Sequence, residues 1–182
     1  MKFNKSVLFV FLLLIIVASV CRVLGYAPQL AMAVFAGAII KDKRLAFILP
    51  LVSMFFSDLL YEGLFAYGYT NYGGFYEGQL TNYLVIAGIT LIGFWVGGLN
   101  WSKIAIGSLA APLAFFFVSN FFVWLGVGGL GRPLTFSGLL LCYNDAVPFF
   151  RASLINTLAF SAILFGGYYL AERLITARKQ LA

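Results

Sequence analysis

Long apolar runs separated by short polar or glycine-rich breaks dominate this sequence. Of its 182 residues, 63% are hydrophobic and 10% are charged, whereas a typical soluble domain is about half apolar and about a quarter charged. A soluble core of this size could not cover so much apolar surface, so the surrounding solvent must be lipid. The chain is therefore expected to be an integral membrane protein.

The breaks divide the chain into six expected transmembrane helices within a single domain, residues 1–182. Glycine, proline and charged turns set their ends. The expected helices are about 6–24, 28–40, 45–62, 81–99, 104–125 and 151–174, with a short re-entrant or interfacial helix at 139–150. This last run is too short for a span, which needs about 20 apolar residues. The predicted fold class is all-α and polytopic.

The first run has a second interpretation. Lys2 and Lys5 followed by a short apolar run also describe a signal peptide. The cleavage pattern is poor, however, because residues 18–20 (ASV) lack the second small residue that cleavage requires. A retained first transmembrane helix is the favoured interpretation.

The basic residues predict the orientation in the membrane. Six spans place both termini on one side, and the positive-inside rule places the basic loops in the cytoplasm. Nine basic residues then lie inside and three outside, the latter being Arg22, Arg132 and Arg151; the nine are Lys2, Lys5, Lys41, Lys43, Arg44, Lys103, Arg173, Arg178 and Lys179. The net charge of +6 is thus expected to face anionic lipid rather than a nucleic acid.

A concentration of polar side chains in residues 115–158 is the main functional signal. Polar groups are costly in hydrocarbon when unpaired, and ionisable ones usually face a cavity or a partner. We expect these side chains to line an outward-facing cavity together with one acid of the third helix. The candidate substrate-binding residues are Asn120, Trp124, Arg132, Tyr143, Asn144, Asp145, Arg151 and Asp58.

Such a cavity suits a small organic ligand. Arg132 or Arg151 is expected to meet an anionic group of the ligand, Trp124 to stack on a ring, and the amide side chains to orient the molecule. Loops at 63–80 and 126–138 are expected to act as lids, because their glycines supply hinges.

The same residues also fit a purely structural role. Interfacial tyrosines are common in membrane proteins, and Asp–Arg pairs often only hold loops together. For Asp58, Arg132 and Arg151 both interpretations stay open, whereas a structural role is favoured for the tyrosines of residues 67–76. Cys21 and Cys142 are expected near the outer side, as buried small side chains rather than as a disulfide.

Signatures of an enzyme are weak. The chain has no histidine, which removes the usual general base and the commonest metal ligand. Ser137 lies in a loop similar to the serine loop of intramembrane proteases, but no histidine is present to activate it. An aspartyl pair of Asp58 and Asp145 is a formal possibility only. We therefore expect no enzyme activity, no catalytic residues, no metal and no cofactor.

Three blocks of the sequence carry a family resemblance. They are residues 31–38 (AMAVFAGA), 50–58 (PLVSMFFSD) and 119–151, which includes SNFFVWL and CYNDAVPFFR. Together they resemble a family of small bacterial membrane proteins of unknown function. That family in turn resembles the S components, the substrate-binding subunits of energy-coupling-factor (ECF) vitamin transporters, in size, helix number, small-residue surface and polar pocket.

The resemblance implies a place in the bacterial cytoplasmic (inner) membrane and capture of a vitamin-like micronutrient. It also implies docking on a transmembrane coupling protein with ATPase subunits. In S components small residues on the first helix make the docking contact, whereas here Ala33 and Gly37 lie on the second helix. Gly93 and Gly97 form another surface for close helix packing on the fourth.

The sequence thus favours a membrane-embedded small-solute-binding protein, an S-component-like uptake subunit. A non-transport scaffold or accessory subunit is the chief alternative, and an intramembrane enzyme is the third.

Overall fold

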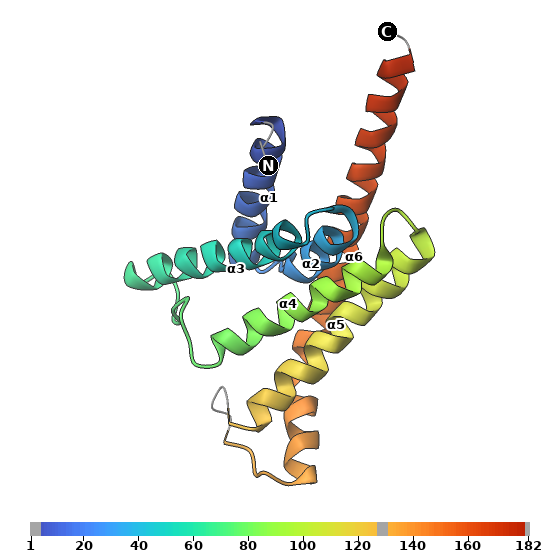
Figure 1. The fold of residues 1–182 in the computed structure, drawn as a ribbon. Helices are drawn as coiled ribbons and strands as arrows, with labels where there is room; N and C mark the ends of the chain where they lie inside the picture. Colours follow the sequence, from blue (N-terminus) through green and yellow to red (C-terminus); the bar gives the residue numbers. More distant parts are fainter. Residues whose placement is uncertain (1–4, 127–130, 181–182) are drawn as a thin grey trace.

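The structure is a computed structural model that describes residues 5–126 and 131–180. Within these residues the fold is all-α with six helices, as predicted (Figure 1). The helices are α1 (Lys5–Val23), α2 (Gln29–Ile39), α3 (Lys43–Ala66), α4 (Gln79–Val96), α5 (Trp101–Trp124) and α6 (Phe136–Gln180). Part of the predicted loop at 126–138, residues 127–130, lies outside the described residues.

Four helices of the described chain, α3 to α6, are long and apolar enough to cross a membrane. The described part of α1 is a shorter apolar helix, Leu8–Val23, and α2 is shorter still. With 11 residues, α2 measures about 16 Å at 1.5 Å per residue, which is about half the thickness of the hydrocarbon layer. Four of the six predicted spans are therefore long enough to cross a membrane.

Helix α2 forms the centre of the fold. All residues from Gln29 to Gly37 are buried, and α2 contacts α3, α4, α5 and α6. It lies in the middle of the ribbon, with the other helices around it (Figure 1). The ring of Phe35 packs edge-on against that of Phe165 from α6, with centroids 5.2 Å apart. Apart from Gln29, this short helix is apolar on all sides, as expected for a helix that protein surrounds.

Glycines allow α2 and α4 to cross closely. A Cβ placed on Gly37 would lie 2.8 Å from the Cα of Gly93, and one on Gly93 would lie equally close to Gly37. The close helix packing that was predicted for the small residues of the second and fourth helices is therefore confirmed at Gly37 and Gly93. Gly97 has a different role from the one predicted, because it ends α4 with a left-handed φ of 60°. Ala33 and Gly37 are fully covered inside the chain.

The prediction of a separate short helix at 139–150 is wrong. It joins the predicted sixth helix in one helix of 45 residues, α6. Pro148 lies inside α6, where it removes one backbone hydrogen bond, and no glycine occurs between Gly138 and Gly166. One missing hydrogen bond does not stop a helix whose start packs against α5. The far end of α6 extends beyond the other helices at the top of Figure 1.

Side-chain caps fix the starts of two membrane-span helices. Asp42 accepts hydrogen bonds from the backbone N–H groups of Arg44 and Leu45 at the start of α3. Asn100 accepts one from Lys103 at the start of α5. Both caps occupy the basic turns that the orientation rule places in the cytoplasm. They satisfy N–H groups that a helix start leaves without backbone partners.

Candidate functional site

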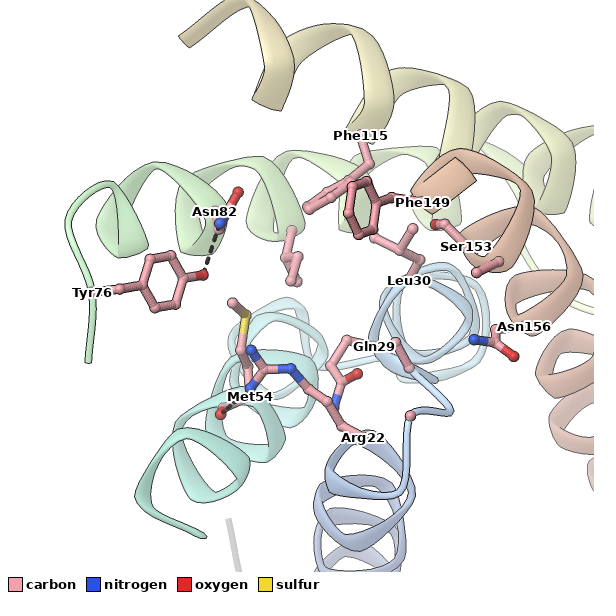
Figure 2. A pocket seen from close by; sticks show the side chains of 14 residues that line it. Arg22, Gln29, Leu30, Met54, Tyr76, Asn82, Phe115, Phe149, Ser153 and Asn156 are labelled. Carbon is pink, nitrogen blue, oxygen red and sulfur yellow. Dashed lines mark hydrogen bonds between the residues drawn. The ribbon is translucent and has the colours of Figure 1, made fainter. Parts of the chain in front are cut away.

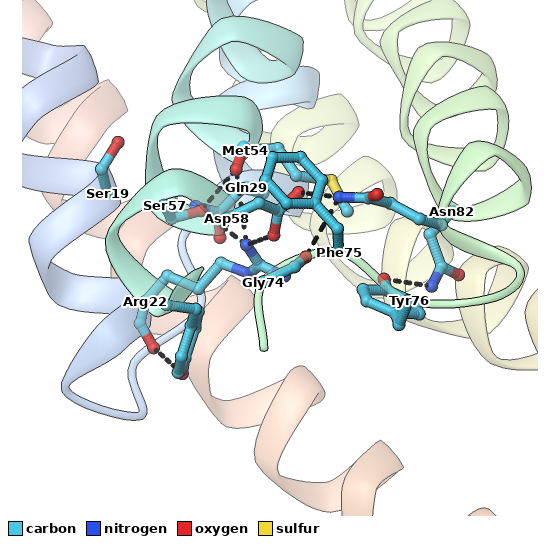
Figure 3. Close-up of polar contacts among 12 residues, drawn as sticks. Ser19, Arg22, Gln29, Met54, Ser57, Asp58, Gly74, Phe75, Tyr76 and Asn82 are labelled. Atoms are coloured by element: carbon cyan, nitrogen blue, oxygen red, sulfur yellow. Dashed lines mark hydrogen bonds and ion pairs between the residues drawn. The ribbon is translucent and has the colours of Figure 1, made fainter. Parts of the chain in front are cut away.

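A buried ion pair joins α1 to α3. Asp58 on α3 has no exposed surface, and its carboxylate accepts a hydrogen bond from the guanidinium of Arg22 at the end of α1. Arg22 also donates to the hydroxyl of Ser57, at 2.6 Å. Two groups of α4 also donate to the carboxylate of Asp58: the amide of Gln79, at 2.7 Å, and the hydroxyl of Tyr83, at 2.6 Å. Figure 3 shows Arg22, Ser57 and Asp58 with the contacts between them.

The loop between α3 and α4, residues 67–78, lies against this ion pair. The backbone N–H of Gly74 donates to the carboxylate of Glu62, at 2.9 Å, and its carbonyl accepts from Gln79, at 3.2 Å. A Cβ on Gly74 would overlap the backbone carbonyl of Asp58. Glycine is therefore required here by close backbone approach rather than by an unusual φ.

A cavity of about 250 Å³ opens beside the ion pair. Residues from all six helices and from the 67–78 loop line it (Figure 2). Its polar lining residues are Arg22, Gln29, Tyr76, Asn82, Ser153 and Asn156. Apolar side chains, including Phe115 and Phe149, supply the rest of the wall. This mixture of an apolar wall and a few polar groups is typical of a small-molecule site.

Gln29 is the polar side chain most deeply buried in this wall. It is 3% exposed, and its amide nitrogen reaches the carbonyl of Ala18 at 3.4 Å. Its side-chain oxygen Oε1 has no hydrogen-bond partner among the described residues. An unsatisfied buried acceptor costs about 1–3 kcal/mol, so a group that donates to Oε1 would stabilise the site.

A second cavity of about 220 Å³ adjoins the first and shares Asn82, Phe115, Phe149 and Ser153 with it. Asn120 lies in the wall of this second cavity. Its amide group donates to the carbonyl of its own helix at Phe116, at 2.7 Å. The two cavities together extend from the end of α1 to the space between α5 and α6.

The other predicted site residues lie where α5 meets the start of α6, and most of them bind each other or the backbone. Arg132 pairs with Asp145, and these side chains are 38% and 39% exposed. The indole N–H of Trp124 donates to the carbonyl of Pro133, at 2.9 Å. The hydroxyl of Tyr143 donates to the carbonyl of Phe117, at 3.0 Å. These contacts hold the start of α6 and the segment before it on α5.

The predicted site residues therefore do not come together at one site in the structure. Asn120 lines a cavity, and Asp58 lies in the separate buried pair with Arg22. Asn144 and Arg151 are exposed on α6. No cavity described above is lined by Trp124, Arg132, Tyr143, Asn144, Asp145 or Arg151.

The prediction did not select Gln29, Asn82, Ser153 or Asn156 as site residues. Gln29 had a usable signal, because it is the only polar residue of α2 (QLAMAVFAGAI). A lone amide in a short, otherwise apolar helix indicates a buried polar contact. For Asn82, at the start of α4, the sequence offered no comparable signal.

The part of the chain that the structure describes has few other groups that could bind a metal or react. No group of three or more histidine, cysteine or acidic residues there could hold a metal ion. Cys21 and Cys142 are free thiols, the second of them buried. The hydroxyls of Thr135 and Ser137 lie 3.0 Å apart, exposed at the start of α6.

The helices and the cavity between them define an all-α protein of membrane character. Residues 2–179 match the model of a family of unknown function, DUF6580, and the chain belongs to that family. No curated protein and no solved structure matches the chain.

Proposed function

We propose that this protein binds a small solute in the cavity between its helices, as the substrate-binding subunit of an uptake system. The observation that carries the proposal is Gln29, a 3% exposed residue in the wall of a cavity of about 250 Å³, whose Oε1 has no hydrogen-bond partner among the described residues. A structural amide would be expected to have both ends satisfied inside the fold. A bound molecule gives Oε1 the donor that it lacks once the amide rotates toward the cavity.

The position of the cavity supports capture from outside the cell. It lies at the end of the helices that carries Arg22 and Asn82, opposite the turns with Lys41, Lys43 and Lys103. With the basic turns in the cytoplasm, the cavity faces the exterior. Because amide, hydroxyl and aromatic side chains converge there from separate helices, small movements between helices would open or close it.

Coupling to a separate transmembrane protein, as in ECF transporters, needs another contact surface than the predicted one. Ala33 and Gly37 are covered by α4 and by other parts of the chain. A coupling partner would therefore contact an outer face of α3 to α6 or the exposed α1. This differs from the S-component arrangement and leaves uptake without an ATPase module as an alternative.

A scaffold or accessory role is the second candidate. The pair of Arg132 and Asp145, with the Trp124 and Tyr143 contacts to backbone carbonyls, favours it. In that role these residues only hold α6 on α5, and the cavity is a packing gap.

Mass spectrometry distinguishes solute binding from a scaffold role. It is applied to the molecules released from the full-length protein after purification in mild detergent. We expect a compound that is retained by the wild type and by Arg132→Ala, and lost from Gln29→Met with helical content unchanged. Absence of any specific compound, from protein purified at several growth stages, would favour the scaffold.

A further inference from the structure

The charge of the cavity wall limits the kind of molecule it can hold. Among the residues that line the cavity of about 250 Å³, Arg22 is the only one with a charged side chain. Its guanidinium is engaged by the fully buried carboxylate of Asp58 and by the hydroxyl of Ser57. The pair is neutral as a unit, and Asp58 does not line the cavity.

Such a wall favours neither an anionic nor a cationic ligand. The charge of Arg22 is already neutralised by a buried carboxylate, so an anion at its remaining N–H groups would gain little and would be repelled by Asp58. A cation would find no carboxylate in the wall, and burial of an unpaired charge is strongly unfavourable. An uncharged molecule meets neither penalty.

Two of the remaining polar groups of the wall present acceptor oxygens. Oε1 of Gln29 is buried and has no partner in the part of the chain that the structure describes. The amide group of Asn82 donates to the hydroxyl of Tyr76, at 2.8 Å, so that its own carbonyl oxygen is not used by this bond (Figure 2). A molecule with N–H or O–H donors can satisfy both oxygens.

The apolar part of the wall favours a ring. Phe115 from α5 and Phe149 from α6 lie next to each other in Figure 2, with Leu30 of α2 beneath them. Aromatic side chains contribute a large apolar area and favourable contact with another ring.

We infer, resting on the proposed function, that the ligand is an uncharged ring compound that presents an N–H donor to Gln29. Carboxamides and lactam-containing heterocycles have this chemistry. This kind of ligand differs from the anionic one expected from the sequence, because Arg132 and Arg151 line neither cavity and Arg22 is paired with Asp58.

Three probes of the same shape test it: benzamide, benzoate and benzamidinium. Saturation-transfer NMR on the full-length protein in detergent at pH 7 measures their binding. We expect benzamide to bind at least about tenfold more tightly than either ion, and Gln29→Met to weaken benzamide about tenfold by removing the acceptor. Asn71→Met, which replaces another amide by methionine at an exposed loop position, should leave binding unchanged.

Gln29→Glu supplies a second variant in case Gln29→Met does not fold. A carboxylate at this position should reverse the preference, so that benzamidinium becomes the tightest probe.

Loss of the preference for an uncharged ligand and loss of the small-solute site give different results. Benzoate binding as tightly as benzamide, or benzamide binding that Gln29→Met leaves unchanged, would overturn the inference while a small-solute site survived. Binding of none of the probes, together with no released compound, would overturn both.

Discussion

Gly37 of α2 and Gly93 of α4 face each other so closely that each occupies the space a side chain of the other would need. This crossing holds the central helix against the membrane-span helix that carries Asn82. Helices in lipid gain little from apolar burial, so they depend on close backbone approach of this kind. The position of the cavity wall therefore depends on two residues that have no side chain.

Gly93→Ala should destabilise the protein. The added methyl group would overlap the backbone of α2 at Val34 and Gly37, and overpacking of this kind costs about 1–3 kcal/mol. Gly88→Ala is the matched control, because a Cβ at Gly88 on the same helix meets no atom within 4 Å. Thermal unfolding in detergent measures both. A lower midpoint for Gly88→Ala than for Gly93→Ala would contradict the close crossing.

Arg22→Met should be among the most destabilising single changes in the chain. It leaves the carboxylate of Asp58 buried without its cation, which costs about 3–5 kcal/mol. The exposed pair of Arg132 and Asp145 gives the comparison, since an exposed ion pair contributes about 0–1 kcal/mol. Thermal midpoints in the same detergent should therefore fall much further for Arg22→Met than for Arg132→Met.

The double variant Arg22→Met/Asp58→Leu tests the cause. It should recover part of the lost stability, because it removes the unpaired charge along with its former partner. No recovery would show that the packing of Arg22, rather than its charge, holds α1 on α3.

The helices could be predicted from the sequence because apolar runs and their breaks are local properties. Asp42 and Asn100 cap helices within three residues of themselves, so such starts are visible in the sequence. The continuity of α6 was not predicted, because Pro148 and the polar residues before it resemble a helix end. Only packing against α5 shows that the helix continues.

The candidate site was harder to predict because its residues meet only through the tertiary fold. Arg22 and Asp58 are 36 positions apart, and sequence distance gave no reason to pair them rather than Asp58 with Arg132 or Arg151. Within 115–158, four of the polar residues instead make contacts that hold α6 and the segment before it on α5, namely Trp124, Arg132, Tyr143 and Asp145. Gln29 is a single amide, so it does not raise the local density of polar residues. Its position in an otherwise apolar helix nevertheless indicates a buried polar contact.

Gly74→Ala should release the loop at 67–78 from α3. Its Cβ would overlap the carbonyl of Asp58, so the loop must move and the bond from Gly74 to Glu62 must lengthen or break. Limited proteolysis measures the release, and we expect faster cleavage within the loop. Gly63→Ala is the control, because a Cβ there meets nothing within 4 Å and alanine favours the helix. Equal cleavage rates for the two variants would show that the loop is not held at Gly74.

Helix α4 should carry the chain across the membrane, with the 67–78 loop outside and the start of α5 inside. Asn71→Cys and Ser102→Cys, each introduced with Cys21→Ser and Cys142→Ser, place one exposed thiol on either side of α4. A membrane-impermeant maleimide should label Asn71→Cys in spheroplasts and Ser102→Cys only after permeabilisation, because the basic residues near Ser102 favour the cytoplasm. The opposite pattern would reverse the orientation and turn the cavity toward the cytoplasm. Labelling of both thiols from outside would mean that α4 does not cross.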